Sequence, residues 1–186
     1  PAYTHPNESI GRITKFSPGT KENAAVFCHA VAFKIAVDCL EKRGDKGYTS
    51  LRAIMPNNKE YEHYKAEPYV FAEFLVGPDH PYLFGEGAFT WLTGAAGWIF
   101  MIATEWMLGA RKEFGGLLID PCIPSSWPKC RIVRPFRGAV YDIKIENPDR
   151  VCSGIKEMYV DEKRAKGNLI KPHGDGQVHK VRVVLG

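Results

Sequence analysis

The chain has 186 residues, of which 45% are hydrophobic and 12% aromatic, enough apolar material for one large domain or two small ones. An apolar content this high argues against disorder. Its 25 basic and 21 acidic residues are spread along the sequence and give a formal charge of +4, so we expect a mildly basic, solvated surface and no nucleic-acid partner.

The first predicted element is a long helix. Apolar residues within residues 23–43 cover more than one helical face, and Gly44 follows in the position of a helix stop. We expect a largely buried helix there, of about five to six turns. Residues 47–55 predict a short second helix ended by Pro56, and residues 57–68 predict a polar loop.

The next segment, residues 69–76, is short and apolar throughout, so its pattern fits a strand or a helix equally well. Residues 89–108 predict the second long helix, ended by Gly109. Glu105 interrupts its apolar run, which is also too short to span a membrane, so we expect no membrane partner. Helices this apolar require other helices around them.

The second half of the chain reads as β structure. Prolines break up any helix there, and three runs with strand character follow: residues 139–145, 155–160 and 178–185. Residues 173–177 (HGDGQ) predict a tight turn between strands. The sequence therefore predicts an α+β protein with a helical part, residues 1–114, and an antiparallel β part, residues 115–186.

Cysteine and histidine usage predicts neither disulfides nor a metal. The five cysteines are odd in number and form no CxxC pair: Cys28, Cys39, Cys122, Cys130 and Cys152. Cys28 and Cys39 lie inside an apolar periodic run, which favours reduced, buried thiols in a cytoplasmic protein. The six histidines and the cysteines show no ligand cluster at zinc-like spacing, so we expect no metal site.

Two segments carry candidate ligand-binding groups at the entrance to a helix-compatible run: residues 15–29 and 85–98. In the first, His29 follows Glu22 by two helical turns, so both side chains would share one rim if the helix begins near Glu22. A histidine there could donate a hydrogen bond to phosphate, or could be a satisfied core residue. In the second, Thr93 and Gly94 could donate hydroxyl and backbone N–H groups to phosphate, or could form a small-residue packing patch.

Two further charged residues are candidates for substrate contacts. Glu73 is an acidic residue inside an apolar run, which makes it either partnered or functional. Lys21 could reach sugar hydroxyls or phosphate, although a lone lysine is more often a surface residue.

These two segments, together with residues 116–127 (GLLIDPCIPSSW) and 134–148 (RPFRGAVYDIKIENP), resemble the cellobiose, cellodextrin and chitobiose phosphorylases of glycoside hydrolase family 94. The resemblance implies the last helices of an (α/α)6 barrel followed by a C-terminal β-sandwich. It implies that His29, Thr93 and Gly94 bind phosphate, and that Lys21, Glu22 and Glu73 contact substrate. Some members of the family carry glutamine where Glu73 stands, and an ionised glutamate would repel phosphate.

The resemblance further implies inverting phosphorolysis of a β-linked disaccharide or short oligosaccharide, with inorganic phosphate as co-substrate and no cofactor. Members of the family are several times longer, so we expect this chain to be a C-terminal portion that needs the remainder of a parent enzyme. The general acid of the family lies upstream of the matching segments, so no residue here is expected to be catalytic and the chain alone is expected to be inactive. The full-length protein is expected to be a homodimer.

Two other functions stay open. The chain could be a non-catalytic fragment or subunit that binds carbohydrate or stabilises a partner. A glucoamylase-like hydrolase on the same barrel would require a paired acid and base, and the sequence shows no such pair.

Overall fold

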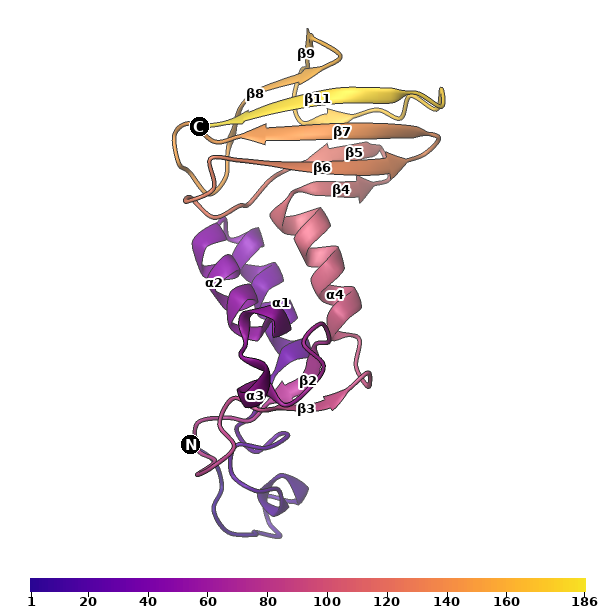
Figure 1. Ribbon diagram of the computed structural model, residues 1–186. Helices are drawn as coiled ribbons and strands as arrows, with labels where there is room; N and C mark the ends of the chain where they lie inside the picture. Colours follow the sequence, from indigo (N-terminus) through magenta and orange to yellow (C-terminus); the bar gives the residue numbers. More distant parts are fainter. The chain divides into compact units, whose positions relative to one another are not determined.

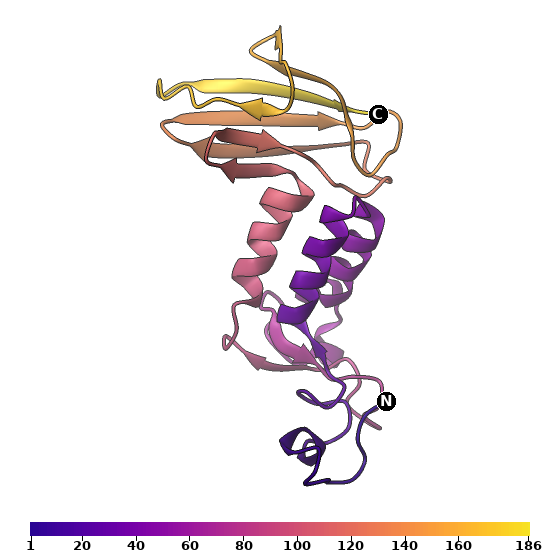
Figure 2. The same ribbon diagram turned by 180° about the vertical axis from the view of Figure 1, so that it is seen from behind.

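The structure is a computed structural model that describes residues 1–186, and its internal contacts divide the chain into two compact units (Figures 1 and 2). Unit 1 consists of residues 1–34 and 49–99, and unit 2 of residues 35–48 and 100–186. No helix in the chain combines the length and the apolar character that crossing a lipid bilayer requires.

Unit 1 combines short helices with a small sheet. The two longest helices, α1 (Cys28–Leu40) and α2 (Gly44–Ile54), have residues in both units. The other elements of unit 1 are η1 (Arg12–Lys15), β1 (Val26–Phe27), η2 (Pro56–Asn58), α3 (Tyr61–Tyr64), β2 (Ala72–Leu75), β3 (Gly87–Thr90) and most of α4 (Ala95–Met101). Strands β1, β2 and β3 form one antiparallel sheet in that order.

Both long helices begin later than predicted. The helix expected from residue 23 begins at Cys28, and the helix expected from residue 89 begins at Ala95. The backbone is left-handed at Ala24, Phe89 and Trp91, with φ of 71°, 56° and 67°, and these conformations cannot belong to a right-handed helix. The predicted second helix exists and ends before Pro56, but α2 begins at Gly44 and not at residue 47. The ambiguous segment 69–76 contains a strand.

Unit 2 contains the β region, defined here as residues 110–185. A π-helix, η3 (Ile102–Met107), leads into the β region. Gly109, between this helix and β4, has a φ of +71°. A Cβ at this position would lie 2.3 Å from the carbonyl carbon of Asp120, so only glycine fits. Its strands are β4 (Ala110–Glu113), β5 (Gly116–Ile119), β6 (Lys129–Phe136), β7 (Ala139–Glu146), β8 (Ile155–Val160), β9 (Lys163–Arg164), β10 (Leu169–Ile170) and β11 (Val178–Leu185).

These strands form two sheets, in the orders β10-β5-β4 and β6-β7-β11-β8-β9. Alternate residues of β7, from Ala139 to Ile145, are buried, which confirms the period-two pattern. Both sheets contribute to one apolar cluster, for example through Leu117 and Ile119 of β5 and Ile143 and Val183 of the larger sheet. The bounds predicted for β8 and β11 are confirmed, whereas the domain boundary at residues 114–115 stays a prediction.

The expectation of a purely antiparallel β half is wrong in one pairing. Strand β11 lies between β7 and β8 in both views (Figures 1 and 2), antiparallel to β8 but parallel to β7. Because β7 and β8 run in opposite directions, a strand between them must be parallel to one and antiparallel to the other. The larger sheet is therefore mixed.

The beginning of α2 is fixed to the loop that follows β5. Asp45 accepts hydrogen bonds from the backbone N–H of Ser125 at 2.8 Å and from its hydroxyl at 2.9 Å. A Cβ at Gly44 would lie 2.2 Å from the carbonyl oxygen of Ile123, so glycine permits the close approach. Lys42 forms a 2.7 Å ion pair with Asp120 in the same loop.

Candidate functional site

The small sheet of unit 1 determines where the candidate phosphate ligands lie. Strands β1 and β3 are both antiparallel to the central strand β2. They therefore run in the same direction, and their C-terminal ends lie at the same end of the sheet. The chain leaves β1 directly into α1, where His29 is the second residue, and leaves β3 toward Thr93 and Gly94. Glu73 lies in β2, near the same end of the sheet.

His29 lies beside Gly94. A Cβ at Gly94 would lie 3.4 Å from Cε1 of His29 and 3.4 Å from Cδ1 of Trp98. The imidazole ring of His29 lies between two aromatic rings, with centroid distances of 5.0 Å to Phe33 and 6.1 Å to Trp98. Its Nε2 atom is buried and has no hydrogen-bond partner. A buried polar nitrogen without a partner is costly and points to a ligand that would satisfy it.

Thr93 and Gly94 lie at the start of α4 and make local hydrogen bonds there. The Thr93 hydroxyl oxygen accepts a 3.3 Å hydrogen bond from the N–H of Ala95, the first residue of α4. The carbonyl oxygen of Gly94 accepts from the N–H of Trp98 at 3.0 Å. Gly94 is exposed, so its backbone is accessible to a small anion. The structure therefore places Gly94 beside His29, with Thr93 as the preceding residue, and phosphate binding by the three stays a prediction.

Lys21 and Glu73 form a second group in unit 1. Lys21 Nζ lies 3.9 Å from Glu73 Oε1, and the two side chains are 30% and 16% exposed. The ammonium group also lies 4.0 Å from the centroid of the Phe89 ring, a cation–π distance. Glu73 thus has a charged partner, and its contact with substrate stays a prediction.

An open cleft of about 410 Å³ adjoins this second group, and Lys21, Phe74 and Phe89 contribute to its wall. Glu86 also lines it and forms a 2.5 Å ion pair with Lys65. The wall of the cleft therefore combines one member of each ion pair, Lys21 and Glu86, with aromatic side chains.

Glu22 does not share a helical rim with His29, because α1 begins at Cys28. Glu22 is exposed in a turn between Thr20 and Asn23, and the left-handed backbone of Lys21 (φ 46°) excludes a helix there. The neighbouring Asn23 is buried, and its amide donates to the carbonyl oxygen of Phe16 at 2.7 Å. The turn is therefore held by Asn23, and a sugar contact from Glu22 stays a prediction.

Glu67 is a residue that the sequence reasoning missed. Its carboxylate accepts a 2.9 Å hydrogen bond from the indole N–H of Trp91 and a 3.5 Å bond from the hydroxyl of Thr90. These bonds, led by the one from Trp91, lower the pKa of Glu67. They connect Glu67 to the end of β3 and to Trp91, where the backbone is left-handed (φ 67°). A glutamate in a polar loop carries no sequence signal for this role.

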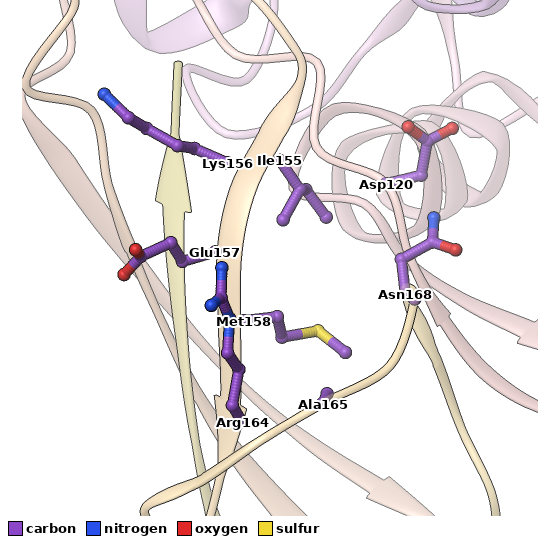
Figure 3. A pocket seen from close by; sticks show the side chains of 9 residues that line it. Asp120, Ile155, Lys156, Glu157, Met158, Arg164, Ala165 and Asn168 are labelled. Atoms are coloured by element: carbon purple, nitrogen blue, oxygen red, sulfur yellow. The ribbon is translucent and has the colours of Figure 1, made fainter.

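The β region holds a different cleft, of about 360 Å³, between β8 and the segment from Arg164 to Asn168 (Figure 3). Figure 3 shows Met158 pointing from β8 toward Asn168. None of the predicted site residues lines this cleft. The predicted residues all lie in unit 1.

Comparison with known proteins identifies the family of the chain. Residues 1–109 match the sequence model of the family described as the glycosyl hydrolase 94 superfamily, catalytic domain. The chain is 40% identical over 185 residues to a solabiose phosphorylase of Paenibacillus borealis, an alignment that covers 98% of this chain and 24% of the relative. It is 38% identical over 188 residues to an N,N'-diacetylchitobiose phosphorylase of Vibrio proteolyticus, covering 100% and 23% of the two chains.

A 3-O-beta-D-glucopyranosyl-beta-D-glucuronide phosphorylase of Paenibacillus borealis is 31% identical over 187 residues, covering 100% of this chain and 24% of the relative. The chain thus spans about a quarter of the length of these curated relatives. Because the family match extends over more than half of its residues, the chain belongs to the glycosyl hydrolase 94 superfamily.

Proposed function

We propose that the chain supplies the phosphate cradle and part of the sugar site of an enzyme that cleaves a β-linked disaccharide or short oligosaccharide by inverting phosphorolysis. The phosphorylase names of its relatives support the reaction class. The observation that carries the phosphate assignment is the buried, unpartnered Nε2 of His29 beside Gly94.

In this proposal, phosphate accepts hydrogen bonds from three groups: Nε2–H of His29, the hydroxyl of Thr93 and the backbone N–H of Gly94. A protonated imidazole would add charge to the first bond. Glycine at position 94 keeps the approach open, since a Cβ would already touch His29 and Trp98. Such a cradle holds an anion and does not activate water.

Lys21 and Glu73 are proposed to contact substrate near this anion. The ammonium group of Lys21 compensates the charge of Glu73, so a carboxylate at this position repels phosphate less than an isolated one would. Glu22, exposed in its turn, is proposed to bind sugar hydroxyls. Phe89, in the wall of the cleft that Lys21 also lines, offers an aromatic face to a sugar.

The reaction makes one bond and breaks one bond at the anomeric carbon. A phosphate oxygen attacks that carbon from the face opposite the leaving oxygen, and the glycosidic C–O bond breaks as a carboxylic acid protonates that oxygen. The product is an α-sugar 1-phosphate and a shortened acceptor. Phosphate is the nucleophile, so this step uses no second carboxylate, no metal and no cofactor.

The general acid is proposed to come from the remainder of a parent enzyme, so the chain by itself is expected to be inactive. In that parent, the helices of this chain would complete an (α/α)6 barrel and the β region would form a β-sandwich. The parent is proposed to act as a homodimer.

The test uses the parent enzyme with His29→Ala. Loss of a charge-assisted hydrogen bond should weaken phosphate binding by roughly 1–3 kcal/mol, with a smaller effect on disaccharide binding. The rate of α-1-phosphate formation, followed by the anomeric proton in NMR at a series of phosphate concentrations, measures this. His5→Ala is the matched control, because His5 is an exposed histidine of the same unit.

Three outcomes would contradict the proposal. An unchanged phosphate dependence in His29→Ala would remove the phosphate role of this residue. Release of free sugar without phosphate would favour a hydrolase. Binding without turnover of a broad panel of β-linked disaccharides would favour a non-catalytic carbohydrate-binding protein.

A further inference from the structure

Two histidines and an aspartate meet at one end of the larger sheet of the β region. Asp161, His173 and His179 each offer one ligand atom, and these atoms all lie within 4.8 Å of one another. They belong to unit 2, whereas the phosphate cradle belongs to unit 1. We propose that they form a structural binding site for a divalent transition-metal ion, with Zn²⁺ as the ion that the donor set fits best.

His179 is the buried centre of this cluster. It lies on β11, opposite Tyr141 of β7, and is only 7% exposed. Its Nδ1 lies 2.6 Å from Oδ2 of Asp161, and its Nε2 lies 3.2 Å from Oδ1 of Asp175. An imidazole that ligates a metal through one nitrogen commonly donates its other N–H to a carboxylate. Asp175 is the carboxylate that would accept the N–H of Nε2, so Nδ1 is the atom that would bind the metal. Oδ2 of Asp161 lies next to this Nδ1.

His173 repeats this arrangement. Its Nδ1 lies 3.0 Å from the hydroxyl of Tyr141, and its backbone N–H donates to the same hydroxyl at 3.2 Å. The hydroxyl thus fixes one nitrogen of the ring and leaves Nε2 for a ligand. The ring is stacked on that of His179, with centroids 3.7 Å apart and an interplanar angle of 20°.

Asp161 is aimed at the site by the backbone of β11. It follows the last residue of β8, its N–H donates to the carbonyl oxygen of Lys180 at 2.9 Å, and its Oδ1 accepts from the N–H of Lys180 at 2.9 Å. These bonds direct the second carboxylate oxygen, Oδ2, to His179. An ion would take the place of the proton between Oδ2 and Nδ1.

Metal binding requires a small rearrangement of the three donor groups. Zn²⁺ binds nitrogen and oxygen donors at about 2.0–2.2 Å, so tetrahedral donors lie about 3.4 Å apart. Oδ2 of Asp161 and Nδ1 of His179, which are 2.6 Å apart, must therefore separate by about 0.8 Å. The His173 ring must turn out of its stack so that its nitrogen approaches these two atoms. His173 is exposed in the connection between β10 and β11, where Gly174 and Gly176 have φ of 67° and 73°. This connection supplies the adjustment.

The donor set selects the ion. Imidazole nitrogens suit zinc, copper and nickel, whereas Ca²⁺ and Mg²⁺ prefer oxygen ligands alone. The site has two nitrogens and one carboxylate, and water would complete a tetrahedron. The sequence did not reveal it, because the three ligands come from three separate segments without a spacing motif.

The test titrates Zn²⁺ into the full chain, stripped with a chelator, by calorimetry. We expect one equivalent to bind in a saturable manner and to raise the midpoint of thermal unfolding. His173→Ala should lower the affinity by at least about 100-fold, and Asp175→Asn by about 10-fold through loss of the outer hydrogen bond. His63→Ala, which changes a histidine of unit 1, should leave the affinity unchanged.

His173 is the informative position, because it is exposed and its replacement leaves the buried His179 in the sheet. Co²⁺ in place of Zn²⁺ gives an independent readout, since a tetrahedral nitrogen and oxygen site produces intense visible absorption that His173→Ala should abolish. Absence of a saturable equivalent in the unmodified chain, or equal affinity in His173→Ala, would overturn the proposal. Phosphorolysis by the parent is not expected to respond to the chelator, so this proposal and the phosphate cradle fail independently.

Discussion

The β region and unit 1 bury their apolar side chains to very different degrees. In the β region, alternate residues of β7 and β11 enter one shared core, and Tyr141, Ile143, Ile145 and Val183 are fully buried. Unit 1 leaves large apolar side chains exposed, among them Phe33, Phe89, Trp91, Leu92 and Trp98. The candidate phosphate ligands lie among these exposed side chains and beside left-handed backbone. The binding groups therefore belong to the unit that leaves more of its large apolar side chains exposed.

The strongest test of this contrast is Ile145→Ala in the β region. Ile145 is fully buried in the shared core, so its truncation should lower the free energy of unfolding by about 2–5 kcal/mol. Val178→Ala on β11, where the side chain is 62% exposed, should change it by less than about 0.5 kcal/mol. Urea denaturation followed by circular dichroism measures both. Equal effects would contradict the assignment of Ile145 to a closely packed core.

A pair of glycines sharpens the contrast through the backbone. Gly109→Ala should destabilise unit 2 by at least about 1–2 kcal/mol, since φ is +71° and a Cβ would collide with Asp120. Gly97→Ala should stabilise the chain by about 0.5–1 kcal/mol, because this glycine lies within α4 and a Cβ would meet no atom within 4 Å. Thermal melts of the two variants should therefore shift in opposite directions, and a shift in the same direction would refute the argument.

Gly94→Ala should separate binding from stability in unit 1. A Cβ there would press on His29 and Trp98 at 3.4 Å, which the neighbours can accommodate by small shifts. We expect phosphate affinity of the parent enzyme to fall by about 10-fold, or 1.4 kcal/mol, while the unfolding midpoint changes little. Gly97→Ala is again the matched control. A loss of stability without a loss of affinity would favour the packing interpretation of this glycine.

The smallest effect concerns pH and the link between α2 and the loop after β5. The backbone hydrogen bond from Ser125 lowers the pKa of Asp45 below its ordinary value of 3.8. A lowered folded-state pKa means that the stabilisation is complete above about pH 4 and is lost as pH falls through the folded-state value. Asp45→Asn should therefore reduce the acid dependence of unit 2 stability in this range. Identical pH profiles for the variant and the unmodified chain would contradict this role.

The sequence predicted the strands of the β region better than the short strands of unit 1. The ranges 155–160 and 178–185 are correct, and β7 is one residue longer than predicted. Their side chains alternate because each strand lies with one face on a core. Strands β1 and β3 were missed, since the left-handed residues beside them, Ala24 and Trp91, are not glycines and give no turn signal.

The candidate site shows a similar division. The resemblance to a known family predicted the grouping of His29 with Thr93 and Gly94, and the residues alone left this open. The pairing of Lys21 with Glu73 depends on strand register, and the cluster around His179 depends on the parallel pairing of β7 with β11. Register and strand order arise from the packing of whole sheets and cannot be read from one segment.

The central position of β11 has a consequence for how the protein is made. Strands β7 and β8 leave the ribosome before β11, yet each pairs with β11 and they are not paired with one another. The hairpin of β6 and β7 can form during synthesis, but the larger sheet cannot be completed until residues 178–185 have emerged from the ribosome. Until then, β7 and β8 expose unpaired edges of the kind that promote aggregation. The nascent chain should therefore depend on prompt synthesis of β11, or on a chaperone, for productive folding.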